Sequence, residues 1–137
     1  MNRSLLLLIL AAPFAVLPLV AGAQPAKPAL YTADQATAGA AIYAQSCAAC
    51  HGSQMEGVAA PALKGPAFGE MANAQGLTAQ TLLDVIANTM PQSDPGSLKP
   101  EEFSAVTSYI LQQNGYPAGT APLATGAAGL KDAKVTP

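Results

Sequence analysis

The stretch Cys47-Ala48-Ala49-Cys50-His51 decides how this sequence is understood. It contains both cysteines of the chain and its single histidine, so the side chains best suited to hold a metal cofactor are concentrated in five positions. On a helix, residues three and four positions apart lie on the same face. Cys47, Cys50 and His51 would therefore project to one side, with the imidazole beside the two thiols.

This spacing is the attachment signature of c-type haem, in which two thioethers fix the porphyrin edge and the imidazole binds iron. Three other interpretations are a disulfide, a thioredoxin-like dithiol and a zinc site. A thioredoxin-like site needs a βαβ context, which this sequence lacks, and a structural zinc site needs a fourth ligand. We therefore predict one haem c, covalently attached through Cys47 and Cys50, with His51 as an iron ligand.

The composition after position 23 also favours a cofactor in the core. Leu, Ile, Val and Phe number 18 of those 114 residues, about 16%, and a share below about 20% with high net charge is typical of disorder. Charged residues are only 10% of this chain, so we expect a folded protein whose core is completed by something other than side chains. No long basic tract is present, which argues against nucleic acid as a partner.

Residues 1–23 are predicted to be an export signal. Arg3 supplies a positive charge, residues 5–20 are an uncharged run, and Ala21-Gly22-Ala23 is a small-x-small cleavage site. The alternative is an uncleaved anchor, but a membrane span needs about 20 apolar residues, and this run is shorter and contains two prolines. The mature chain would then begin near Gln24 in the periplasm, an oxidising compartment, without stable membrane insertion.

The remaining sequence predicts an all-α fold, with three main helices and irregular loops around one haem. Thr32 and Gln35 form a capping-box pattern, and Pro100 suits the first position of a helix. Residues 118–137 consist mostly of Ala, Gly, Thr and Pro, which favours a loose tail. The predicted order is an extended leader at 24–30, helices from about Ala33 to Ser46, from the Thr78 cap to Met90 and from Pro100 to Asn114, irregular segments at 52–76 and 92–99, and the tail.

The second axial ligand must be a methionine or be absent, because His51 is the only histidine. Met55 is four residues from His51 and cannot easily reach the opposite face of the ring. Met71 lies in the segment predicted to be irregular and stays possible, although most methionines only pack in cores. Met90 ends a helix, precedes Pro91 and has enough chain before it to reach the far face. We predict Met90 as the ligand, with Met71 or an open position as alternatives.

Taken together, these stretches resemble class I monohaem cytochromes c over residues 31–117. The resemblance implies that the Pro61 carbonyl accepts a hydrogen bond from His51. It also implies that Gly39 and Tyr43 pack where the first helix crosses the last, with Tyr109 as the aromatic partner. The matching stretches are Gly39-x-x-Ile42-Tyr43, Cys47-x-x-Cys50-His51-Gly52, Ala60-Pro61-Ala62-Leu63-Lys64-Gly65, Met90-Pro91 and Phe103-x-x-Val106-x-x-Tyr109-Ile110-Leu111.

Two details refine this resemblance. Pro95-Gly96-Ser97-Leu98 and residues 109–117 are similar to haem c domains that serve quinoprotein dehydrogenases. Lys99 departs from the family pattern, because Ser or Thr would be expected there, and a weak helix cap is the expected consequence.

A haem held by His51 and Met90 leaves no open iron position, so no catalytic residue is predicted and the protein is not expected to be an enzyme. Methionine opposite histidine raises the reduction potential of haem iron. The expected function is periplasmic one-electron transfer, from a dehydrogenase toward a terminal oxidase or another cytochrome. The alternative is a ligand-binding or sensory haem protein whose sixth iron position is open or easily vacated.

Overall fold

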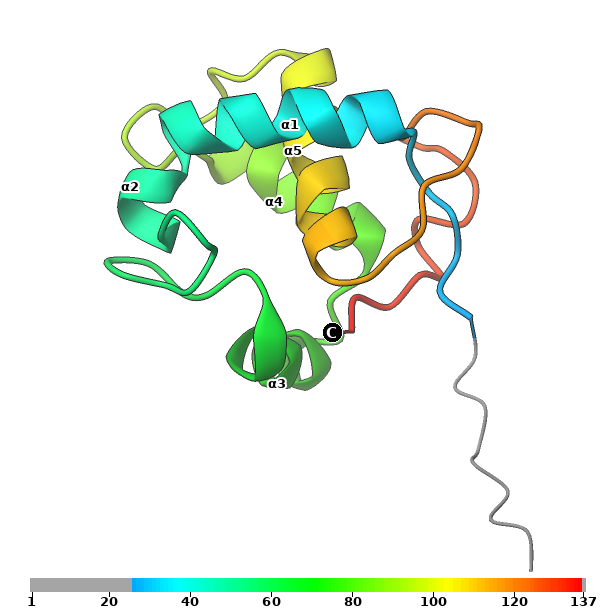
Figure 1. The fold of residues 1–137 in the computed structure, drawn as a ribbon, viewed down its shortest axis with the longest axis horizontal. Helices are drawn as coiled ribbons and strands as arrows, with labels where there is room; N and C mark the ends of the chain where they lie inside the picture. The colour runs from blue at the N-terminus through cyan, green and yellow to red at the C-terminus, as the bar shows by residue number, and fades with distance from the viewer. Residues whose placement is uncertain (1–25, 137) are drawn as a thin grey trace, which may run out of the picture.

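The computed structural model describes residues 26–136, so the predicted export signal at 1–23 lies outside the described residues. Within this range the protein contains helices and two isolated β-bridges but no strand, which confirms the predicted all-α class. No helix in this part of the chain is long and apolar enough to cross a membrane. The helices are α1 (Ala33–Ser46), α2 (Ala48–His51), α3 (Gly65–Gln75), α4 (Ala79–Thr89) and α5 (Pro100–Gln113) (Figure 1).

The crossing of α1 and α5 is the centre of the fold. Gly39 is buried there, and a Cβ atom at this position would overlap the backbone carbonyl of Ala105. Tyr43 and Tyr109 pack edge to face beside it, with ring centroids 5.6 Å apart and planes inclined by 62°. A side chain larger than hydrogen at Gly39 would therefore force the helices apart, and the contact expected from the resemblance is confirmed.

Local hydrogen bonds explain where the two longest helices, α1 and α5, begin. Thr32 accepts the Gln35 amide at 3.3 Å while the Gln35 side chain accepts the Thr32 amide at 3.2 Å, a reciprocal capping box that starts α1. The weak start expected for α5 is compensated, because the Glu102 carboxylate accepts the Lys99 amide at 2.8 Å. The predicted bounds of α1, α4 and α5 agree with the structure to within a residue.

The prediction that residues 52–76 are irregular is wrong for the second half of this segment, which forms α3. Pro66 stands in its first turn, where the missing amide proton costs nothing, and Gly76 ends it in a left-handed conformation with φ 61°. Phe68 and Ala72, four positions apart, are buried on one face of the helix. The glycines at 65 and 69 concealed this short apolar stripe in the sequence.

The prediction of a loose tail is also wrong, because residues 118–136 pack against the helices. We call this segment the C-terminal strap. Its large apolar residues are spaced far apart, yet Leu123, Leu130 and Val135 are each at most 1% exposed. Leu123 exchanges two 2.8 Å hydrogen bonds with the side chain of Gln35 on α1. The Val135 amide donates to the Leu77 carbonyl at 2.8 Å, which ties the end of the strap to the start of α4.

Residues 26–30 of the leader form no helix or strand and pack beside the strap. The Lys27 ammonium donates to the carbonyls of Asn114 at 2.6 Å and Thr136 at 2.8 Å, and it lies 5.0 Å from the centre of the Tyr116 ring. The buried Tyr31 hydroxyl donates to the Tyr116 carbonyl at 2.6 Å. Leader, strap and the end of α5 therefore form one continuous packed layer.

Candidate haem-binding site

The Cys-x-x-Cys-His motif begins at the break between α1 and α2. Cys47 ends α1 and starts α2, and its amide donates to the Tyr43 carbonyl at 2.9 Å. Cys50 and His51 lie on α2, where Cys50 is exposed and His51 is half-buried. Both cysteines are free thiols, so the structure contains no disulfide between them. Burial raises the pKa of the Cys47 thiol, and the adjacent Cys50 adds to the shift.

The imidazole of His51 is oriented by a backbone carbonyl. Its Nδ1 atom lies 2.8 Å from the carbonyl oxygen of Pro61. A carbonyl can only accept, so Nδ1 carries the proton, and the lone pair of Nε2 is left for a metal. A carbonyl partner of this kind fixes the plane of a ligating histidine and raises its basicity. This is the contact that the resemblance implies for Pro61.

The loop between His51 and Leu63 is held against α2 by backbone hydrogen bonds. The Cys50 carbonyl accepts the amides of three consecutive residues, at 3.2, 2.9 and 3.0 Å, and the His51 carbonyl accepts the Gly57 amide at 2.8 Å. These carbonyls at the end of a four-residue helix would otherwise lack partners. The loop therefore satisfies the helix end and delivers the Pro61 carbonyl to His51. The three donors to Cys50 are Val58, Ala59 and Ala60.

The three described methionines have different surroundings. Met55 is 1% exposed and belongs to the hydrophobic core, and the half-buried Met71 packs against that core from α3. Met90 directly follows α4, is half-buried, and is not among the side chains that pack against the core in the described part of the chain. Figure 1 shows α2 and the loop after α4 toward the same side of the molecule. Among the methionines that the structure describes, only Met90 has a thioether that does not pack in or against the core.

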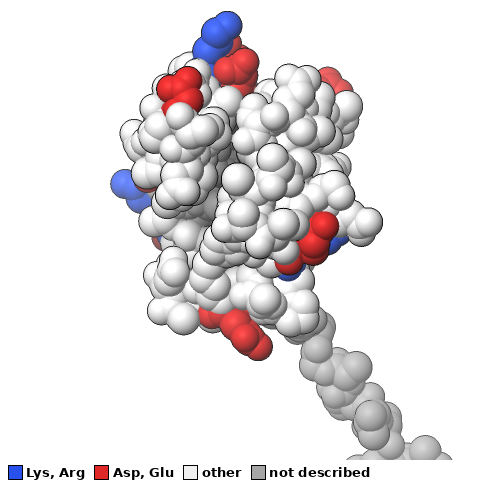
Figure 2. Space-filling model, turned by 90° about the vertical axis from the view of Figure 1, so that its left-hand side faces the viewer, with Lys and Arg blue, Asp and Glu red and all other residues white. Residues whose placement is uncertain are grey.

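The residues around the motif fit a flat apolar cofactor with two thioether links. Leu63 and Leu98 remain half-buried although they contact the core, so apolar surface is left without protein cover. Figure 2 shows the face on which α2 lies, hollowed by a groove between uncharged side chains, with the charged ones toward its margin. Two free thiols, an imidazole with an available nitrogen and uncovered apolar side chains together match the chemistry of haem c.

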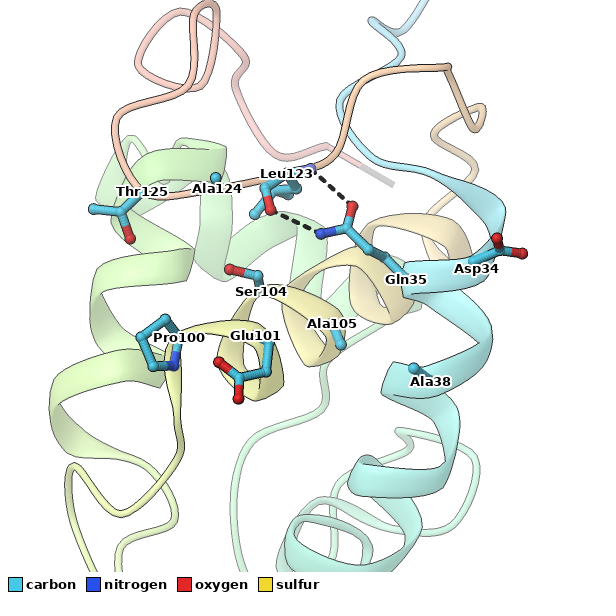
Figure 3. A pocket seen from close by; sticks show the side chains of 10 residues that line it. All are labelled: Asp34, Gln35, Ala38, Pro100, Glu101, Ser104, Ala105, Leu123, Ala124 and Thr125. Carbon is cyan, nitrogen blue, oxygen red and sulfur yellow. Dashed lines mark hydrogen bonds between the residues drawn. The ribbon is translucent and has the colours of Figure 1, made fainter.

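Other parts of the described chain offer no competing metal site. Within residues 26–136 no three His, Cys, Asp or Glu side chains are placed to hold a metal ion together, and this includes Cys47, Cys50 and His51, whose cysteines are predicted to bind the porphyrin rather than the iron. A groove of about 580 Å³ lies between the first turns of α1 and α5 and the strap, and no residue of the motif lines it. In Figure 3 the Gln35 side chain crosses toward Leu123, and the carboxylates of Asp34 and Glu101 point in different directions. That groove carries no convergent set of ligating groups.

One residue near the motif has a role that the sequence did not reveal. Tyr43 was expected only to pack against Tyr109, but its buried hydroxyl also donates to the Gly52 carbonyl at 2.7 Å. The available signal was a tyrosine four residues before Cys47, one helical turn from the motif. A phenylalanine there would give the same packing pattern, so only the structure reveals the hydrogen bond.

Comparison with known proteins gives one family. The family model described as cytochrome c oxidase, cbb3-type, subunit III matches residues 34–110, which include the motif, Pro61 and Met90. No curated protein and no solved structure matches the chain significantly.

Proposed function

Since this chain belongs to the family described as cytochrome c oxidase, cbb3-type, subunit III, we propose that it is an exported one-electron carrier whose haem iron is held by His51 and Met90. The family establishes a covalent haem c and electron transfer as the general activity. The proposal that His51 is an iron ligand rests mainly on one observation, the orientation of its imidazole by the Pro61 carbonyl at 2.8 Å. A histidine fixed in this way, one residue after a free Cys50, is prepared to bind iron through Nε2.

When bound, the haem supplies a reversible one-electron change between Fe(III) and Fe(II). The chain's own residues determine how this change is made accessible. Cys47 and Cys50 would hold the porphyrin through thioether bonds, His51 would bind its iron, and the Pro61 carbonyl would keep that imidazole from rotating. All four residues lie on short, hydrogen-bonded segments, so little protein movement needs to accompany the change of charge.

Met90 is proposed as the second axial ligand. Support comes from its place directly after α4 and from its side chain being half-buried without packing against the core. Met55 and Met71 are both engaged in core packing, which leaves their sulfur atoms less free to bind iron. A thioether opposite an imidazole raises the reduction potential. That potential suits a carrier that accepts electrons from a dehydrogenase and passes them toward an oxidase or another cytochrome.

The partners and the compartment follow from the same proposal. The predicted signal at 1–23 would place the mature protein in the periplasm, where haem c is exposed to other exported redox proteins. The face shown in Figure 2 carries its charges only toward the margin, which supports docking of a partner beside the haem through apolar contact rather than strong electrostatic steering. A periplasmic dehydrogenase, including one of the quinoprotein type, is the proposed donor.

The exported protein tests this function directly. We expect its intact mass to equal the polypeptide from about Gln24 plus one haem, and its reductive titration to consume one electron per chain. Carbon monoxide should leave the spectrum of the reduced protein unchanged, because both axial positions are filled. A complete spectral change with carbon monoxide would instead support a ligand-binding haem protein and would contradict the electron-carrier proposal.

A further inference from the structure

The Gly52 carbonyl, one residue after His51, is held from two sides. The Tyr43 hydroxyl donates to it at 2.7 Å and the Met55 amide donates to it at 3.2 Å. Gly52 has φ 87°, a conformation that side-chain-bearing residues rarely adopt, and a Cβ atom there would overlap the Glu56 carboxylate. The backbone directly after the iron ligand is therefore sharply turned, and a single side-chain hydroxyl helps to keep it there.

Tyr43 is itself among the most firmly placed side chains of the protein. It is 2% exposed, and its ring packs edge to face on Tyr109 where α1 crosses α5 next to Gly39. Burial raises the pKa of Tyr43 to about 12. The hydroxyl therefore stays protonated at physiological pH and acts as a permanent donor to the Gly52 carbonyl.

We propose that Tyr43 is a positioning residue for His51, linking the backbone of the iron ligand to the helix crossing at the centre of the fold. This inference rests on His51 being an axial ligand, as the proposed function states. The Pro61 carbonyl restrains the imidazole ring at Nδ1, and Tyr43 restrains the backbone on the C-terminal side of the same residue. With both restraints present, the ring has one direction in which to present Nε2. Without the Tyr43 bond, the Gly52 carbonyl loses the one side-chain donor that it has among the described residues.

A purely structural role would make the Tyr43 bond equivalent to any other buried tyrosine bond. The chain contains a matched control for such a structural bond. The Tyr31 hydroxyl donates to the Tyr116 carbonyl at 2.6 Å, and Tyr31 is as buried as Tyr43 but lies next to the C-terminal strap. Tyr109 supplies the opposite control, since it contacts Tyr43 but its hydroxyl makes no hydrogen bond to described residues that would be lost. Three Tyr→Phe variants thus remove the same hydroxyl oxygen from three settings: a bond next to His51 (Tyr43), a buried bond beside the strap (Tyr31) and a hydroxyl without a described partner (Tyr109).

The experiment compares Tyr43→Phe, Tyr31→Phe and Tyr109→Phe as intact haem-loaded proteins. The readouts are the electron paramagnetic resonance g values of the oxidised iron, the midpoint potential and the midpoint of urea unfolding. We expect Tyr43→Phe and Tyr31→Phe to lose similar stability, while only Tyr43→Phe changes the g values and shifts the potential. Equal g values and potentials in all three variants would overturn the proposal and leave Tyr43 with a structural role alone.

Incomplete haem loading also decides the question. If Tyr43→Phe carries less haem than the wild type, spectra are taken on the loaded fraction, and the loading of Tyr31→Phe sets the loss expected from stability alone. A larger loss in Tyr43→Phe than in Tyr31→Phe, together with changed g values in the loaded fraction, supports positioning, whereas unchanged g values and an unchanged potential in that fraction contradict it whatever the loss. The wild-type spectrum separates the two proposals. A wild-type iron without histidine ligation would refute the proposed function, and a histidine-ligated iron unaffected by Tyr43→Phe would refute only this inference.

Discussion

The two sides of this molecule differ in how completely protein atoms cover them. On the strap side, defined as residues 26–32 and 116–136, Tyr31, Tyr116, Leu123, Leu130 and Val135 are buried, and among the leucines and valines only Leu30 is half-buried. On the haem side, defined as residues 47–64 and 90–99, Met55 is buried, but Cys47, His51, Leu63, Met90 and Leu98 are only half-buried. The same chain therefore finishes one side of its core with its own side chains and leaves the other side incomplete.

This difference shows where the cofactor contributes to folding. The exposed part of a half-buried apolar side chain adds stability only when something covers it, and burial is worth about 25 cal/mol per Å² of apolar surface. The haem is the group that can provide this cover beside α2. The strap side needs no such group, because the leader, the strap and the end of α5 already bury one another. Stability should thus depend on the haem on one side and on the strap on the other.

The largest expected effect comes from removing haem attachment. Changing both Cys47 and Cys50 to Ala should produce a protein that has lost most of its helical circular dichroism, because the haem side would lack cover and chain entropy would dominate. Hydrogen exchange should find any residual protection at the strap side, around Tyr31 and Leu130. Native helicity with equal protection on both sides would show that the haem side is complete without its cofactor.

Leu130→Ala should have the next largest effect. Leu130 is completely buried in the strap, and truncating a buried leucine costs about 2–5 kcal/mol of unfolding free energy. Val85, which is 45% exposed, provides the control, since Val85→Ala should change stability by at most about 0.5 kcal/mol. Urea unfolding of the haem-loaded proteins measures both. If the two variants were equally stable, the strap would not be part of the core.

Gly39→Val should destabilise the crossing of α1 and α5 by roughly 1–3 kcal/mol, as overpacking does. The added side chain would meet the Ala105 carbonyl and the Tyr109 Cβ, the latter at 3.0 Å. Ala41→Val on the exposed face of α1 controls for the lower helix propensity of valine. Thermal melts of both variants make the comparison, and identical melting temperatures would argue against a close crossing at Gly39.

Lys27→Met should have the smallest effect, about 0.5–1.5 kcal/mol, because the ammonium is partly exposed and its charged hydrogen bonds are partly screened. The variant removes the donors to the Asn114 and Thr136 carbonyls and the contact with the Tyr116 ring. Desolvation lowers the pKa of Lys27, and this cost offsets part of the stability that the hydrogen bonds of the ammonium contribute. Lys131→Met, at an exposed position, should leave the urea midpoint unchanged; an equal loss in both variants would mean that Lys27 does not anchor the leader.

The contrast between the two sides also explains what the sequence could and could not predict. The Cys47–His51 motif, the Thr32 cap and Pro100 are local signals, so the motif and α1, α4 and α5 were predictable within a residue. α3 was missed because glycines interrupt its short apolar face. The strap was missed because Leu123, Leu130 and Val135 are isolated in sequence among Ala, Gly and Thr, and only tertiary packing brings them together.

The site itself was partly predictable for the same reason. Spacing alone was enough to identify Cys47, Cys50 and His51 as candidates, and the resemblance supplied Pro61. The hydrogen bond from Tyr43 to Gly52 depends on a turn at Gly52 with φ 87°, and no pattern of residue types encodes where that carbonyl points.

The most direct test of the central claim is the sulfur-to-iron charge-transfer band of the oxidised protein in Met90→Ala and in Met71→Ala. Both variants shorten a half-buried methionine, but Met71 packs against the core and Met90 does not. The proposed electron carrier predicts that the band disappears in Met90→Ala, together with a lower midpoint potential and new binding of carbon monoxide, and that it persists in Met71→Ala. A band that persists in Met90→Ala and disappears in Met71→Ala would contradict the assignment of the iron ligand.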